Sequence, residues 1–167
     1  MRRRGFLLLP LAGLLSGCGY TVRGTLPSHI QSISVPIFRN RTQEPAVETL
    51  ITRAVVEGFS TNGRLRVVSS GQADAVLDGE VIGYTVGSIA FDKDSNVRVY
   101  RLVVTVNIRL RDVKQNTVLF QQNDVREQAD FRVQDAVSQT ISREETALRA
   151  AATEIGRAIV SLTITRF

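Results

Sequence analysis

The stretch RLVVTVNIRLRD, residues 101–112, decides the fold of this chain. Its large apolar residues recur at every second position, and polar residues fill most positions between them. This alternation is typical of a β-strand that is buried on one face only. The apolar face consists of Leu102, Val104, Val106, Ile108 and Leu110, and the other of Arg101, Thr105, Asn107, Arg109 and Arg111, with Val103 as the exception. We therefore expect a sheet with one face in the core, and a second, arginine-bearing face that is either solvated or covered by a partner.

Two further strands flank this one and connect to it by short polar loops. The segment 75–87 precedes it, and the segment from Thr117 to about Asp130 follows it. The connecting segments 92–96 and 112–116 are short and rich in Asp, Asn and Lys, which favours tight turns. Strands joined by such turns pair antiparallel.

The N-terminal part of the domain predicts a strand, a helix and a short strand. Residues 30–38 alternate apolar and polar positions, and Pro36 indicates that this strand lies at a sheet edge or ends there, because proline cannot donate a ladder hydrogen bond. Residues 47–59 repeat apolar side chains at helical spacing, with Thr42 as the expected N-cap and Asn62-Gly63 as the stop. The short strand 65–68 follows, and such a strand–helix–strand unit predicts parallel pairing.

A long amphipathic helix follows near the C-terminus. Its start lies between Val133 and Ser142, and Ser142 could cap it. Gly156 costs about 1 kcal/mol relative to alanine in a helix interior, which suggests close packing on a neighbour. The apolar stripe consists of Ile141, Leu148, Ala152, Ile155, Ile159 and Leu162. Because both helices have one apolar face, we expect an α+β two-layer sandwich, with two helices packed on one face of a mixed, mainly antiparallel sheet of about four strands.

The first 17 residues have the composition of a secretory signal peptide: three arginines, an apolar run and small residues before Cys18. The run is shorter than the roughly 20 residues that cross a bilayer as a helix. The stretch Leu15-Ser16-Gly17-Cys18 resembles the lipobox of bacterial lipoproteins, in which the cysteine is lipidated and becomes the first residue after cleavage. We expect residues 1–17 to be a signal peptide, 18–28 a lipidated N-terminus and linker, and 29–167 a single α+β domain.

Cys18 is the only cysteine, so it has no intramolecular disulfide partner and lipid attachment is its expected role. Gly19, which follows it, is compatible with sorting to the outer membrane. The stretch Arg3-Arg4-Gly5-Phe6-Leu7 also fits the twin-arginine export pattern, while the very apolar core favours the general secretory route. The export route therefore stays open.

The charge and the inventory of reactive residues argue against several function classes. The net charge of +5 falls to about +2 without the first 17 residues, which weakens the case for nucleic-acid binding. His29 is the only histidine, so neither a Ser/His/Asp or Cys/His arrangement nor a transition-metal cluster is expected. No glycine-rich loop opens a helix, as phosphate binders require. We expect no enzymatic activity and no cofactor apart from the covalent lipid on Cys18.

Four short stretches give the chain a family resemblance. Cys18-Gly19-Tyr20 is followed by Val22-Arg23-Gly24, then by SVPIFRNRTQEPAVE at 34–48 and ADAVLDG at 73–79. In this order, and over the whole chain, they resemble the LptE family of lipopolysaccharide-assembly lipoproteins. The resemblance implies an outer-membrane lipoprotein, lipid-anchored on the periplasmic side, that plugs and supports the assembly of the LptD β-barrel and binds lipopolysaccharide for delivery to the cell surface.

The resemblance also implies that basic residues in loops at one end of the domain bind lipopolysaccharide. Lys93 and Arg98 flank a hairpin loop, and Arg132 and Arg143 lie between the last strand and the last helix and could join them. Their charges suit the phosphates and carboxylates of lipid A and the inner core; for each residue, a solvated surface charge is the alternative. The pattern hydrophobic-Pro-Phe-x-Asn-x-Thr also occurs in lipoproteins similar to peptidoglycan-synthase activators and curli secretion pores, so a periplasm-facing adaptor or a pore subunit is a second interpretation.

Overall fold

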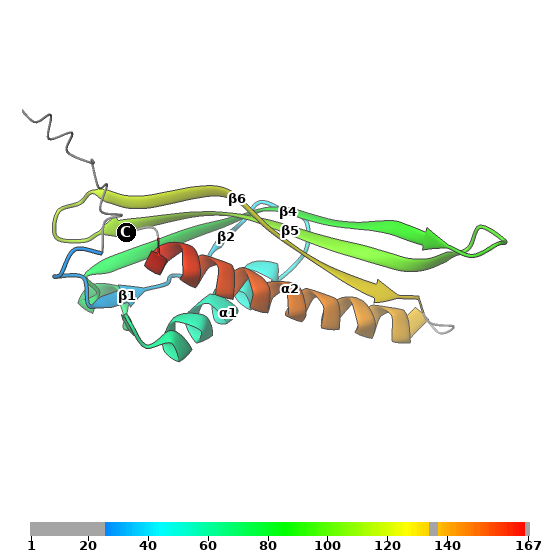
Figure 1. The fold of residues 1–167 in the computed structure, drawn as a ribbon, viewed down its shortest axis with the longest axis horizontal. Helices are drawn as coiled ribbons and strands as arrows, with labels where there is room; N and C mark the ends of the chain where they lie inside the picture. Colours follow the sequence, from blue (N-terminus) through cyan, green and yellow to red (C-terminus); the bar gives the residue numbers. More distant parts are fainter. Residues whose placement is uncertain (1–25, 134–136, 166–167) are drawn as a thin grey trace, which may run out of the picture.

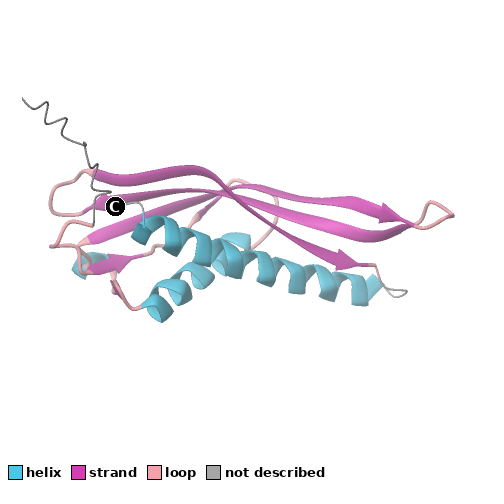
Figure 2. Ribbon diagram, viewed as in Figure 1, coloured by secondary structure: helices cyan, strands magenta, loops and turns pink. Residues whose placement is uncertain are grey.

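The computed structural model describes residues 26–133 and 137–165 as a layer of helices against a layer of strands (Figures 1 and 2). The strands are β1 (Ser32–Ser34), β2 (Arg39–Asn40), β3 (Arg66–Val67), β4 (Ala75–Phe91), β5 (Val97–Asp112) and β6 (Val118–Arg132). The helices are α1 (Val47–Asn62) and α2 (Val137–Thr165), and a 3₁₀ turn spans Ser70–Gln72. Both helices lie on the same side of the sheet (Figure 2). The predicted α+β two-layer arrangement is confirmed.

The strands form one mixed sheet in the order β3-β1-β4-β5-β6, and β2 pairs separately with β4. β1 is parallel to both β3 and β4, as the strand–helix–strand unit predicts, while β4, β5 and β6 pair antiparallel. The sheet has six strands where about four were expected. The difference arises partly because segment 30–38 leaves the sheet after Ser34, and the chain rejoins it as the two-residue β2.

The core lies between β5 and the two helices. The five apolar residues of the deciding stretch are at most 2% exposed, so the predicted inward face is correct. The fully buried helix residues in the same core cluster include Ile51, Val55 and Phe59 of α1 and Ile155 and Ile159 of α2. Among the described residues, no helix combines the length and apolar character needed to cross a membrane.

The expected alternation of residues 30–38 is only partly correct. Ile33 is buried, but Ile37 is 70% exposed, and Ser32 and Ser34 are buried. Phe38 turns inward instead: its N–H donates to Thr52 Oγ1 at 3.0 Å. Its ring lies over Gly79, where a Cβ would come within 2.4 Å of the ring carbons. At Pro36-Ile37-Phe38 the chain therefore leaves the sheet, and the Phe38 side chain returns to the core.

Thr42 is not the N-cap of the first helix, because α1 begins only at Val47. Asn40 organises the preceding turn: its Oδ1 accepts the N–H and Oγ–H of Thr42 at 2.8 and 2.7 Å, and its Nδ2 donates to the Glu44 carbonyl at 2.8 Å and to the Glu48 carboxylate at 2.9 Å. Thr42 Oγ1 in turn accepts the Glu44 N–H at 3.2 Å. The hydroxyl thus stabilises the turn before the helix.

Ser142 is likewise not a cap, because α2 already begins at Val137. Ile141, which was expected in the apolar stripe, is 54% exposed, and the buried part of the stripe begins only at Ala147. The stripe therefore does not mark the first turns of α2. The stop at Gly63 is confirmed, with φ 71° and its N–H donating to the Phe59 carbonyl. The close approach at Gly156 is also confirmed, because a Cβ there would lie 2.7 Å from the Ala54 carbonyl oxygen of α1.

Candidate anion-binding groove and polar network

The β4–β5 hairpin extends past the short strands β1 and β2 to one end of the molecule (Figure 1). The end of β6 and the start of α2 lie at the same end, and the chain enters the described part, at Leu26, at the opposite end. The Val133 N–H donates to the Arg98 carbonyl at 3.1 Å and so ties the end of β6 to the hairpin. The two connections that the sequence suggested could converge do lie together.

A surface groove of about 550 Å³ runs between β6 and α2 at this end. Its lining residues are Ala129, Asp130, Phe131 and Arg132 from β6, and Arg143, Thr146, Ala147 and Ala150 from α2. Arg132 and Arg143 are both exposed, and neither forms an ion pair within residues 26–133 and 137–165. The one lining carboxylate, Asp130, is already held by the guanidinium of Arg101 at 2.7 and 2.8 Å. This bidentate pair lowers the pKa of Asp130, so that it stays ionised and neutralises Arg101.

The other two predicted residues lie on the hairpin and do not line the groove. Lys93 is exposed in the hairpin loop. Arg98 is exposed as well, but its Nη2 lies 2.7 Å from Asp92 Oδ2. The pKa of Asp92 is lowered, first by the Asn96 N–H that donates to it, so its charge offsets that of Arg98. The structure therefore places all four predicted cations at one end but joins only Arg132 and Arg143 in one groove.

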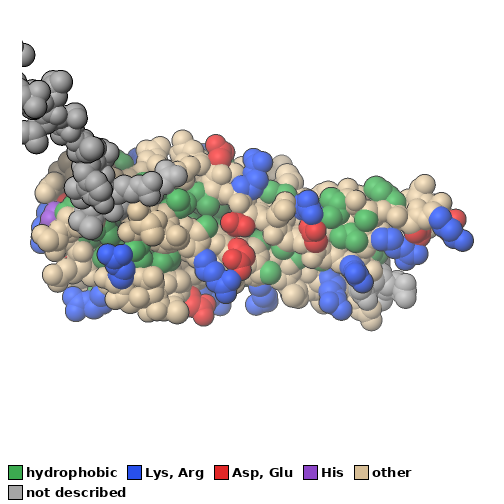
Figure 3. Space-filling model, in the orientation of Figure 1, with side chains coloured by type: hydrophobic (Ala, Val, Ile, Leu, Met, Phe, Trp, Pro, Cys, Tyr) green, Lys and Arg blue, Asp and Glu red, His purple; other side chains and the backbone are tan. Residues whose placement is uncertain are grey.

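Apolar side chains accompany the cations at this end (Figure 3). Ile89 and Phe91 on the hairpin are 44% and 58% exposed. In the groove, the Phe131 ring is buried and stacks on Tyr100 with centroids 5.5 Å apart. Arginine beside apolar surface suits a ligand that combines an anionic group with hydrocarbon. The sequence missed the apolar wall of the groove, because its alanines and Phe131 come from two elements that only the tertiary fold brings together.

The outward face of the sheet carries arginines that have carboxylate neighbours. Arg111 Nη2 lies 4.0 Å from Asp78 Oδ2, and Arg101 is held by Asp130. Only Arg109 of the three forms no ion pair within the described residues. This face is therefore a network of mixed charge on neighbouring strands rather than a concentrated basic patch.

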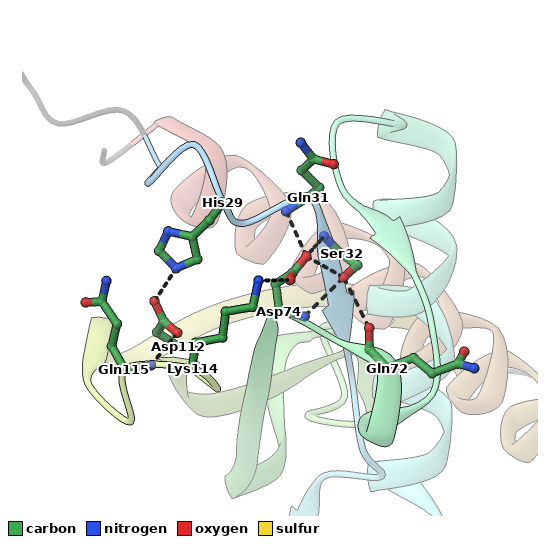
Figure 4. A network of polar contacts seen from close by, with 8 residues as sticks. All are labelled: His29, Gln31, Ser32, Gln72, Asp74, Asp112, Lys114 and Gln115. Carbon is green, nitrogen blue, oxygen red and sulfur yellow. Dashed lines mark hydrogen bonds and ion pairs between the residues drawn. The ribbon is translucent and has the colours of Figure 1, made fainter.

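A polar network at the opposite end fixes the entry of the chain (Figure 4). Asp74 Oδ2 accepts the Ser32 hydroxyl at 2.7 Å and the N–H groups of Gln31 and Ser32 at 3.2 and 3.1 Å. These bonds, chiefly that of the Ser32 hydroxyl, lower the pKa of Asp74 to about 2. Beside it, His29 Nε2 donates to Asp112 Oδ2 at 2.6 Å, and the Asp112 side chain has no solvent exposure.

The network holds the backbone rather than performing chemistry. Its histidine bonds to Asp112 and not to the Ser32 hydroxyl, which donates to Asp74, so it contains no nucleophile–base pair (Figure 4). The described residues also contain no group of His, Cys, Asp and Glu side chains placed to hold a metal ion. Sequence reasoning missed this network, because Asp112 is 83 positions from His29 and no local pattern links them. Cys18, the predicted lipidation site, lies outside the described residues.

Comparisons with solved structures agree with this fold. The chain is similar to an uncharacterised lipoprotein B from Nitrosomonas europaea, with 20% identity, a TM-score of 0.52, and coverage of 87% of this chain and 92% of that one. It is also similar to a hypothetical protein from Chlamydia trachomatis, with 10% identity, a TM-score of 0.55, and coverage of 80% and 95%. The PelC dodecamer from Paraburkholderia phytofirmans gives 16% identity, a TM-score of 0.52, and coverage of 83% and 90%. At these identities the similarity shows the fold alone.

No curated protein matches the sequence. The family model for LptE, described as lipopolysaccharide-assembly, matches residues 30–163. This range covers the sheet from β1 onward, both helices but for the last turn of α2, the groove and most of the polar network, so the match embraces the fold and both sites. The chain therefore belongs to the LptE family of lipopolysaccharide-assembly lipoproteins.

Proposed function

We propose that this chain is an outer-membrane lipoprotein, anchored through Cys18 on the periplasmic side, that plugs and supports the assembly of an LptD-like β-barrel and binds lipopolysaccharide. Family membership implies a non-catalytic role in lipopolysaccharide assembly. The finer claims concern the lipid anchor, the barrel partner and the ligand. Each of them has its own experiment.

One observation carries the ligand claim. Arg132 and Arg143 line one groove with an apolar wall, and neither has an ionic partner among the described residues. Lipopolysaccharide offers both of the matching groups, because its lipid A carries phosphates next to acyl chains. A guanidinium pairs with a phosphate through two parallel hydrogen bonds, which makes arginine better suited to this role than lysine. Lys93 adds a further cation on the adjacent hairpin.

The ligand claim is tested by measuring the binding of intact and dephosphorylated lipopolysaccharide to the folded chain. We expect the variant Arg132→Ala/Arg143→Ala to lose between about fivefold and thirtyfold in affinity for the intact ligand, since each of the two exposed charged contacts contributes up to about 1 kcal/mol. The loss should be smaller for dephosphorylated ligand and should shrink in high salt, which screens exposed charges. The matched control is Arg109→Ala/Arg111→Ala, which removes the same charge from the outward sheet face. If the control loses as much affinity as the groove variant, the site is misassigned.

The barrel claim is tested by purifying the chain from detergent-solubilised envelope and identifying what accompanies it. A large β-barrel protein in equal amount is the expected result. A ring made only of copies of this chain would contradict the proposal and favour a pore subunit; the PelC dodecamer is an assembly of many copies of a protein with this fold. A peptidoglycan synthase as the sole companion would favour the adaptor interpretation.

A further inference from the structure

Strand β4 has an open edge over its second half. β5 pairs with one side of β4 along its whole length. On the other side, β1 pairs at Ala75 and Val76 and β2 at Glu80 and Val81. Within the described residues, no strand pairs with this side beyond Val81. Along residues 82–91, the backbone N–H and C=O groups that do not bond to β5 therefore face outward without a strand partner, on the part of the hairpin that projects past β2 (Figure 1).

Between the register shifts that flank it, the stretch Gly83–Ser88 of this edge lacks the features that normally protect a sheet edge from pairing. Proteins guard such edges with charged side chains, proline or bulges. From Val81 to Phe91 the chain carries no charged residue and no proline, and every residue from Thr85 to Ile89 is exposed. The other long edge strand, β6, is guarded by a bulge at Asp124, which has φ 55°, and by its charges. Those charges are Asp124, Arg126, Glu127, Asp130 and Arg132. The open edge of β4 carries no such charges, and this difference marks it as a surface for strand pairing.

We propose that the segment Gly83–Ser88 of β4 binds an extended, uncharged segment of a partner protein as an additional β-strand. The unpaired backbone groups require an occupant that supplies donors and acceptors at strand spacing, which a polypeptide does and an acyl chain does not. Gly83–Ser88 pairs with β5 without interruption between two register shifts. The regular edge therefore accommodates about six residues of partner, a length of about 20 Å.

The side chains along this edge also indicate what size of side chain the partner segment should place beside them. Residues paired directly across antiparallel strands lie on the same face. Val86 pairs with buried Leu102 and so lies on the helix side, whereas Gly87 pairs with Arg101 on the outward side. A Cβ at Gly87 would meet nothing within 4 Å, so the outward side is open there. Large aromatic side chains of a neighbouring strand can cover such glycines. We expect the partner segment to place a large apolar residue beside Gly87.

A second copy of this chain suits the edge less well. If two copies paired antiparallel through this edge, their N-terminal ends would lie roughly 70 Å apart. This distance is twice the length of the strand from Ala75 to Val86. Residues 18–25 span at most about 29 Å when extended. Both lipid anchors could then reach one membrane only if the pair lay flat on it. A segment of another protein carries no such restriction.

The test places the photo-crosslinking residue p-benzoylphenylalanine at positions 85, 87 and 89 of the full chain in cells, and at position 128 of β6 as a control. We expect adducts from positions 85 and 87 to map about two residues apart onto one uncharged segment of a different protein, and the adduct from position 89, just past the register shift after Ser88, to map next to them in the same order. The variant Thr85→Lys/Gly87→Lys should lower the adduct yield from position 89 by at least about tenfold, because charged side chains on an edge strand oppose pairing and a lysine at position 87 would fill the space expected to hold the partner's large apolar residue. The matched variant Gln121→Lys/Gln128→Lys adds the same charge at exposed positions of β6 and should leave the yield unchanged.

Each other outcome overturns the inference. Adducts with position 85, 87 or 89 of a second copy would show that this edge pairs with another copy of the chain. Scattered adducts, or none, would show that no strand binds this edge. Strand binding at this edge is independent of the proposed function; only the argument against a second copy rests on the proposed lipid anchor at Cys18. If a barrel co-purifies but no ordered adducts form, only the edge assignment fails. If ordered adducts form with a protein that is not a barrel, the edge stands and the barrel claim fails.

Discussion

Gly156 of α2 lies where a side chain would collide with the backbone of α1, 2.7 Å from the Ala54 carbonyl oxygen. A glycine-to-alanine change inside a helix normally gains about 1 kcal/mol. Here we expect Gly156→Ala instead to lower the free energy of unfolding by about 1–3 kcal/mol, because the obstructing atoms belong to a helix backbone that must shift. Urea unfolding measures this. Gly87→Ala, where a Cβ would meet nothing within 4 Å, is the control and should not destabilise the domain. Equal stability of the Gly156 variant and the wild type would refute the close approach.

Asp74 makes the stability of the domain depend on pH. Its pKa is lowered to about 2, first by the Ser32 hydroxyl and then by the Gln31 N–H, whereas in the unfolded chain it lies near its ordinary value of about 3.9. The ionised carboxylate therefore stabilises the fold above about pH 4, and this contribution is lost as the pH falls toward 2. In urea titrations, wild type should exceed Asp74→Asn in stability at neutral pH, and the gap should close between about pH 4 and 2. A gap that stays constant over this window would mean that the hydrogen bonds do not depend on the charge. Lys114→Ala should matter little, because that lysine is 66% exposed.

At the scale of elements, the two faces of β5 should respond differently to truncation. Ile108 is 2% exposed and belongs to the core, so Ile108→Ala should cost roughly 2–5 kcal/mol. Arg109 is its exposed neighbour on the outward face, and Arg109→Ala should change the unfolding free energy by about 0.5 kcal/mol at most. Thermal or chemical unfolding of the two variants checks both values. Comparable losses would mean that something covers the outward face in the isolated domain.

The elements that sequence alone could predict are those with a strong local signal. The alternation in β5 predicted its inward face, Asn62-Gly63 predicted the end of α1, and Gly156 predicted the contact between the helices. The helix starts lie within the expected ranges, but both expected cap residues were wrong. Thr42 and Ser142 are good capping residues by type, and only the tertiary turn around Asn40 and the extension of α2 beside β6 decide otherwise. For the candidate site, the basic residues were visible in the sequence. Their division into a groove pair and a hairpin pair depends on how α2 packs on β6 and could not be predicted.

At the scale of the whole molecule, the fold separates the end where the chain enters the sheet, which the proposed anchor would tether, from the end that carries the hairpin and the groove. The His29–Asp112 bond and the hydrogen bonds of Asp74 hold the chain where it enters the sheet, and the hairpin and groove lie at the far end (Figures 1 and 4). The network therefore defines the point at which an anchor would hold the body. With a lipid on Cys18, the eight residues 18–25 would keep the start of the folded domain within about 26–29 Å of the membrane surface, because this is their fully extended length.

Under the proposed function, Cys18 determines the location of the chain and not its folding. In Cys18→Ala cells fed a palmitate analogue, we expect the chain to lose all label and to move from the outer-membrane fraction to the soluble periplasmic fraction. The melting temperature of the folded domain should stay unchanged, because no other cysteine exists with which Cys18 could form a disulfide. The double change Cys18→Ala/Ser28→Cys is the matched control: it restores a thiol in the linker outside the Leu-Ser-Gly-Cys motif, and it should remain unlabelled and soluble. Labelling of that control would show that any linker thiol is acylated. Undiminished labelling of Cys18→Ala itself would exclude the lipid anchor at this residue, and the tethered-end assignment would then lose its basis.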